Sequence, residues 1–79
     1  MTELEIKENK FYVLRVRTDE GVEATLHSDM DSPIRKIKGH LKSGVSPENI
    51  DLISVEMKGE KFEIKSVPWS VIAVGLVKE

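Results

Sequence analysis

The chain has 79 residues, a formal net charge of −2 and no cysteine. A chain of this length has room for a single domain, residues 1–79, and without cysteine it can form neither a disulfide bond nor a thiolate-bound metal site. It contains no apolar run of the roughly 18 residues that a transmembrane helix needs, and its first residues are too acidic for a secretory signal. We therefore expect a cytoplasmic protein without a membrane partner.

The residue types that catalysis needs do not occur in the required patterns. The two histidines lack the H-x-H and H-E-x-x-H spacings of metal sites, and the sequence has no glycine-rich phosphate-binding motif. We therefore expect no enzymatic activity. Lysine and glutamate dominate the charged residues and glutamine is absent, a composition that is typical of hyperthermophilic proteins.

The first predicted element is a β-hairpin over residues 10–28. Tyr12, Leu14 and Val16 fall on one face of a strand and Arg15 and Arg17 on the other, which is a period of two, and Asp19-Glu20-Gly21 supplies a turn. In the return strand, His27 falls among the polar positions, so we expect its side chain to be exposed. A short edge strand over residues 3–7 is expected to precede the hairpin.

A helix is predicted next, followed by a second hairpin. Ser32 is a good N-cap and Pro33 suits a first helical turn. The apolar residues at helical spacing are Ile34, Ile37, Leu41 and Val45. Gly44 is expected to end the helix. The second hairpin has strands near residues 51–57 and 61–66.

The C-terminal segment, Val67 to Lys78, is compatible with two structures. Trp69, Ile72 and Leu76 share one helical stripe, whereas the density of β-branched residues favours a strand, which is the alternative that we prefer. Either one completes an α+β fold, a mostly antiparallel sheet of four to five strands covered on one face by one or two helices. The order β-hairpin, helix, β-hairpin, C-terminal strand or helix has a rough internal symmetry.

An acidic loop is the first candidate site. Asp29 and Asp31 flank Met30 between the first hairpin and the helix, and Glu48 or Asp51 can add a third carboxylate from the other end of the helix. Such hard oxygen ligands suit Ca²⁺, with weak binding of roughly 10⁻⁴–10⁻³ M because few carboxylates are available. The alternative is structural: the same carboxylates can cap the helix N-terminus.

A basic helix flank is the second candidate site. Arg35, Lys38 and Lys42 share this flank, which can bind an acidic protein or nucleic acid or can simply be a solvated helix face. The acidic pI of about 5.7 disfavours a general nucleic-acid binder. The four aromatic residues are expected in or beside the core and not as base-stacking platforms; they are Phe11, Tyr12, Phe62 and Trp69. Trp69, the only tryptophan, is expected to anchor the core.

In its size, its Lys/Glu-rich and cysteine-free composition and its acidic loop from Ser28 to Ser32, the chain resembles the small uncharacterised α+β proteins of thermophilic archaea. Some of these are described as having an acidic calcium-binding pocket, so the resemblance implies a cation site in this loop. The sequence thus predicts a non-enzymatic, stable domain with a weak divalent-cation site. The alternative prediction is an interaction module that uses the basic helix flank.

Overall fold

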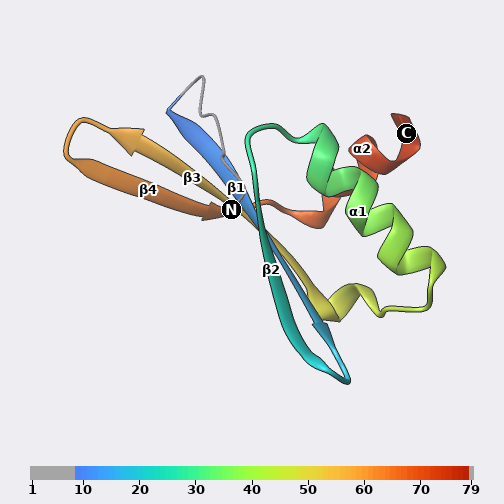
Figure 1. The fold of residues 1–79 in the computed structure, drawn as a ribbon. Coiled ribbons are helices and arrows are strands. Elements are labelled where there is room, and N and C mark those ends of the chain that lie inside the picture. Colours follow the sequence, from blue (N-terminus) through green and yellow to red (C-terminus); the bar gives the residue numbers. More distant parts are fainter. Residues whose placement is uncertain (1–8, 79) are drawn as a thin grey trace.

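The computed structural model describes residues 9–78, which form two β-hairpins, each followed by a helix (Figure 1). In chain order the elements are β1 (Lys10–Thr18), β2 (Gly21–His27), α1 (Asp31–Lys42), the short 3-10 helix η1 (Pro47–Asn49), β3 (Ile50–Lys58), β4 (Lys61–Ser66) and α2 (Trp69–Lys78). The predicted α+β class is confirmed. The edge strand predicted over residues 3–7 lies outside the described residues.

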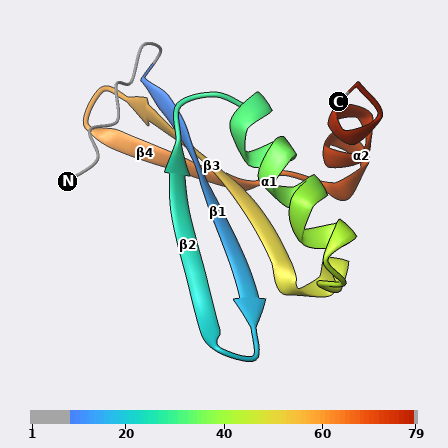
Figure 2. The ribbon, with the colours of Figure 1, turned by 45° about the vertical axis from the view of Figure 1, so that its right-hand side comes forward.

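The strands form one antiparallel sheet in the order β2-β1-β3-β4, and both helices cover the same face of it (Figure 2). The two hairpins have equivalent registers. Val13 pairs with Leu26 in the first hairpin, and the residues 40 positions later, Ile53 and Ser66, pair in the second. Because Val13 also pairs with Ile53, an approximate two-fold axis passes between β1 and β3 and relates two ββα units.

The hydrophobic core lies between the helices and the two central strands. The alternation predicted for β1 is realised, since Leu14 and Val16 point to the helices and are each 1% exposed. The other members of the core cluster are Ile50 and Leu52 of β3, Ile34 and Ile37 of α1, and Ile72 of α2. Both ββα units therefore contribute to one shared core.

Helix α1 ends in a Schellman motif, as the position of Gly44 predicts. The backbone N–H of Val45 donates to the carbonyl of His40, and that of Gly44 donates to the carbonyl of Leu41. Gly44 has a φ of 100°, the left-handed conformation that this motif requires and that glycine adopts without steric cost. Val45 then packs against the core, so the motif also redirects the chain towards η1.

The C-terminal segment is the helix α2, and the strand that we preferred for it is wrong. Pro68 starts the helix, since its carbonyl accepts the backbone N–H groups of Val71 and Ile72. Ile72 is buried in the shared core, and Gly75 lets α2 approach α1 so closely that a Cβ there would lie 3.1 Å from the Ile34 side chain. This tertiary packing outweighs the β-propensity of the valines.

Two aromatic side chains also depart from expectation. Trp69, which we expected to anchor the core, is 37% exposed at the start of α2, and Phe62, expected in or beside the core, is 64% exposed. Tyr12 does pack against the core cluster, as expected. Ile72, and not Trp69, therefore anchors the C-terminal helix in the core.

Candidate functional site

The acidic loop caps helix α1. The Asp29 carboxylate accepts the backbone N–H of Ser32 at 2.9 Å, while Asp31 is exposed in the first helical turn. The helix begins at Asp31, so the expectation that Ser32 is the N-cap is wrong, and the side-chain cap is provided by Asp29 instead. Negative charge at this end of a helix stabilises its free N–H groups. The capping alternative therefore accounts for Asp29.

The other two predicted ligands lie at the opposite end of α1. Glu48 belongs to η1 and Asp51 to β3, whereas Asp29 precedes a helix of 12 residues, which spans about 18 Å. Within residues 9–78, no group of three or more histidine, aspartate or glutamate side chains could hold a metal ion. Calcium binding by Asp29 and Asp31 stays a prediction.

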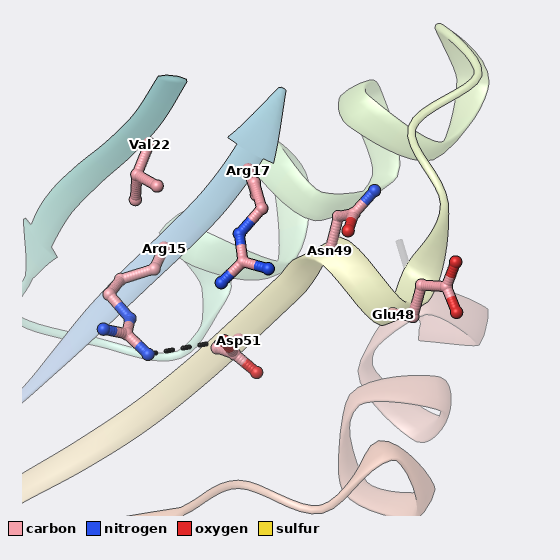
Figure 3. A pocket seen from close by; sticks show the side chains of 6 residues that line it. All are labelled: Arg15, Arg17, Val22, Glu48, Asn49 and Asp51. Carbon is pink, nitrogen blue, oxygen red and sulfur yellow. Dashed lines mark hydrogen bonds and ion pairs between the residues drawn. The ribbon is translucent and has the colours of Figure 1, made fainter. Parts of the chain in front are cut away.

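Glu48 and Asp51 line a small polar pocket between β1 and η1 (Figure 3). Its other lining residues are Arg15, Arg17, Val22 and Asn49. The pocket has a volume of about 60 Å³, which is room for about two water molecules and not for a metabolite. Arg15 and Asp51 form an ion pair at 3.5 Å, with both side chains more than half exposed, so the pair contributes at most about 1 kcal/mol to stability.

His27 is buried, which corrects the expectation that it is exposed. Only 6% of the residue is exposed, its Nε2 lies 2.7 Å from the Thr25 hydroxyl, and its Nδ1 lies 2.9 Å from the Ser32 hydroxyl. The register of the hairpin explains the burial: Tyr12 pairs with His27 and Leu14 with Thr25, so the polar positions of β2 face the helices. The tight turn that links Thr18 to Gly21 already implies this register.

A pH dependence of stability follows from this burial. Burial lowers the pKa of His27 and the charge of Lys36 lowers it further, while Asp29 opposes both. The unfolded chain therefore binds a proton at this histidine at a higher pH than the folded chain does. The free energy of unfolding is expected to decline as the pH falls below about 6.5, and His27 adds no pH dependence above it.

Urea unfolding between about pH 8 and pH 5 measures this decline. The variant His27→Gln should show a shallower decline than the parent chain, because it no longer takes up this proton on unfolding. Equal slopes for the two chains would contradict the assignment to His27.

The basic flank of α1 lies on the side of that helix that meets α2. Ile34 contacts the position of Gly75, and Lys38 and Lys42 follow Ile34 at intervals of one helical turn. Arg35 and Lys42 are exposed, and neither forms an ion pair with any of residues 9–78. Lys38 is half-buried. The structure thus places Lys38 and Lys42 in the row of Ile34, which contacts α2, with Arg35 exposed farther round α1.

Helix α2 presents exposed apolar side chains in the same helical layer. Val71 lies one turn before Gly75 on the side that faces α1, and it is 47% exposed. Val74 and Val77 are 57% and 87% exposed, and the helical rotation of about 100° per residue places Val77 on the side of α2 roughly opposite Gly75, away from α1. Ala73, Val74, Val77 and Lys78 form an open and largely apolar part of the α2 surface. The sequence signalled this surface, because α2 is apolar all round and one helix can bury only one side.

Comparison of the chain with protein-family models, with curated proteins and with solved structures finds no match. Within residues 9–78, no helix has the length and apolar character to cross a membrane.

Proposed function

We propose that the chain is a non-enzymatic interaction module whose helical layer binds an acidic amphipathic helix of a partner protein. The observation that carries the proposal is the presence of exposed cations without ion-pair partners among residues 9–78, Arg35 and Lys42, on the helix that α2 contacts, together with the exposed Val71 and Val74 of α2. An amphipathic helix docks by laying its apolar side chains on an apolar surface, and acidic residues on its border would then meet the basic flank.

The charge distribution supports a specific docking site over a generally basic surface. The chain as a whole is negative, so the cations of α1 form a local positive patch on an acidic protein. Three basic side chains of the sheet are already paired: Lys58 and Lys65 both contact Glu63, and Arg15 contacts Asp51. The helical layer is therefore where an acidic partner gains most from charge complementarity.

The apolar part of the surface favours a protein over a nucleic acid. Binding of single-stranded nucleic acid relies on aromatic platforms for the bases, and the exposed apolar residues of α2 after Trp69 are aliphatic valines. Valine methyl groups instead match the leucine or isoleucine side chains of an amphipathic helix. The only aromatic residue of α2, Trp69, can report on binding through its fluorescence because it is partly exposed.

A titration with a synthetic helical peptide tests the proposal. The peptide carries leucine at positions i, i+3, i+4 and i+7 and glutamate elsewhere, and binding is followed by Trp69 fluorescence and by calorimetry. We expect saturable binding that weakens with salt. The double variant Arg35→Glu, Lys42→Glu should lower the affinity at least about tenfold, and Val74→Asp should do the same.

The matched control for the single variant Lys42→Glu is Lys61→Glu, which makes the same charge change at the start of β4, in the second hairpin. The affinity of this variant should stay within about twofold of the parent chain. An equal loss with Lys61→Glu would show that only net charge matters and would refute a docking site on the helices. Tighter binding of a thymidine oligonucleotide than of the peptide would assign the flank to nucleic acid instead.

A further inference from the structure

The face of the sheet opposite the helices, called the open face from here on, is apolar across all four strands. Alternation and register place eight apolar side chains on it: Phe11, Val13, Leu26, Ile53, Val55, Met57, Phe62 and Ile64. Leu26, Phe62 and Ile64, on the two edge strands, are 57%, 64% and 66% exposed. Val55, on a central strand, is buried. The open face is thus apolar over most of its length, and its charged side chains, Arg15, Arg17 and Asp51, lie at one end.

The second hairpin demonstrates that this apolar character is confined to one face. On its opposite face, the Lys58 ammonium lies 2.7 Å from Glu63 and 3.6 Å from Glu56, and Lys65 also contacts Glu63. These ion pairs hold the pKa of Glu63 at about 2. A sheet face that borders water is normally polar, as this one is. The apolar face of the same hairpin therefore resembles in composition a sheet face that another layer of protein covers.

We propose that a second copy of the chain covers the open face, so that two sheets pack face to face in a symmetric dimer. Sheets packed in this way lie about 10 Å apart with strand directions about 30° from each other. The dimer would have four layers, with the sheets inside and the helices outside. The helical layer of each copy stays accessible, so this proposal does not depend on the proposed function.

The apolar rows of the open face cover, in flat projection, about half of the area that each partner of a stable interface buries. Strands about 4.8 Å apart and alternate residues about 6.7 Å apart give the apolar rows an extent of about 20 by 20 Å. That is about 400 Å² in flat projection, and the accessible surface of protruding side chains is larger. Stable interfaces bury about 800 Å² from each partner, while contiguous apolar patches on monomers rarely exceed a few hundred Å².

The chemistry of the open face favours a second copy over a different protein. Homodimer interfaces are the more apolar class, whereas interfaces with exchanging partners resemble the general protein surface. The eight side chains carry no charge that would select an unlike partner. Small domains also gain stability from oligomerisation when no disulfide supplements the core, and this chain has no cysteine. Arg15, Arg17 and Asp51 lie at one end of the open face, where an interface has its polar rim.

Sedimentation equilibrium of the full chain from about 1 μM to about 1 mM tests the proposal. The expected result is a mass of twice the 8.9 kDa of one chain at the upper concentrations. Ile64→Lys should raise the dissociation constant at least about thirtyfold. Because Ile64 is largely exposed within one chain, the variant should keep its fold, which circular dichroism checks. The matched control is Val77→Lys, at an exposed position of α2, which should leave the dimer intact.

A cross-linking experiment gives a second, independent readout. The chain has no cysteine, so Ile64→Cys and Val77→Cys each introduce a single reactive thiol. A short bis-maleimide should link two copies of the first variant and not of the second. If Ile64→Lys fails to fold, Leu26→Lys on the opposite edge strand replaces it. A parent chain that stays monomeric over the whole concentration range overturns the proposal.

Discussion

Replacing Ile72 by alanine is expected to lower the free energy of unfolding by about 2–5 kcal/mol. Ile72 is 1% exposed and is the one buried side chain of α2, which the structure describes in full. Its loss removes the apolar contact that holds α2 on the core and leaves a cavity among isoleucine and leucine side chains. A domain of this length has a total stability of about 4–12 kcal/mol, so the variant loses a large part of it.

Urea unfolding of the parent chain, Ile72→Ala and Val74→Ala at one fixed protein concentration measures this effect. Val74 lies on the same helix but is more than half exposed, so its replacement should change the free energy of unfolding by no more than about 0.5 kcal/mol. If the two variants were equally stable, the packing of α2 through Ile72 would be wrong.

The second expected result is a difference of sign between two glycine-to-alanine substitutions around α1. Gly44→Ala should lower the free energy of unfolding by about 1–2 kcal/mol, because Gly44 has a φ of 100° and a Cβ makes this conformation costly. Gly39→Ala should raise the free energy of unfolding by up to about 1 kcal/mol, because Gly39 lies inside the helix, where alanine is the better residue.

The two positions are a matched pair, since a Cβ would meet no atom within 4 Å at either one. Steric contact with the rest of the protein therefore cannot explain a difference, and only the backbone conformation remains. Thermal and urea unfolding of both variants provide the measurement. A stabilising Gly44→Ala would mean that α1 does not end in the Schellman motif.

Local sequence patterns predicted the elements whose character depends on near neighbours. The alternation around Leu14 and the helical spacing of Ile34 and Ile37 identified β1 and α1 with their buried faces, and Gly44 identified the helix end. These signals are local because each depends only on residues within the same strand, helix or turn. The α+β class followed from the order of these elements.

The errors concern faces and contacts that other parts of the chain determine. His27 was expected to be exposed because polar positions of a strand usually face water, but the pairing of β2 with β1 turns these positions towards the helices. The apolar positions of β2 and β4 consequently lie on the open face. For α2, the density of valines favoured a strand, whereas the contact of Gly75 with Ile34 favours a helix. Neither the pairing of β2 with β1 nor the contact between Gly75 and Ile34 can be read from a short stretch of sequence.

The candidate site was predicted only where its residues belong to one element. The basic residues Arg35, Lys38 and Lys42 share one helix, so their spacing alone placed them together. The carboxylates Asp29 and Asp51 come from different elements, and their separation depends on the length of α1 and on which end of it each one borders. The valines of α2 belong to the proposed docking surface. In the sequence they indicated only that a helix in this segment would be apolar all round, and they were not assigned to a site.

The antiparallel pairing of β1 with β3 has a consequence for how the chain folds. Each hairpin closes across a short turn, a local event that takes about 1–10 μs, whereas β1 and β3 must meet across the whole of β2, α1 and η1. Neither helix has a core to dock on before that pairing exists, because Leu14 and Leu52 come from opposite sides of it. The slow step of folding is therefore the joining of two preformed hairpins, and a half-folded species has too little buried surface to accumulate.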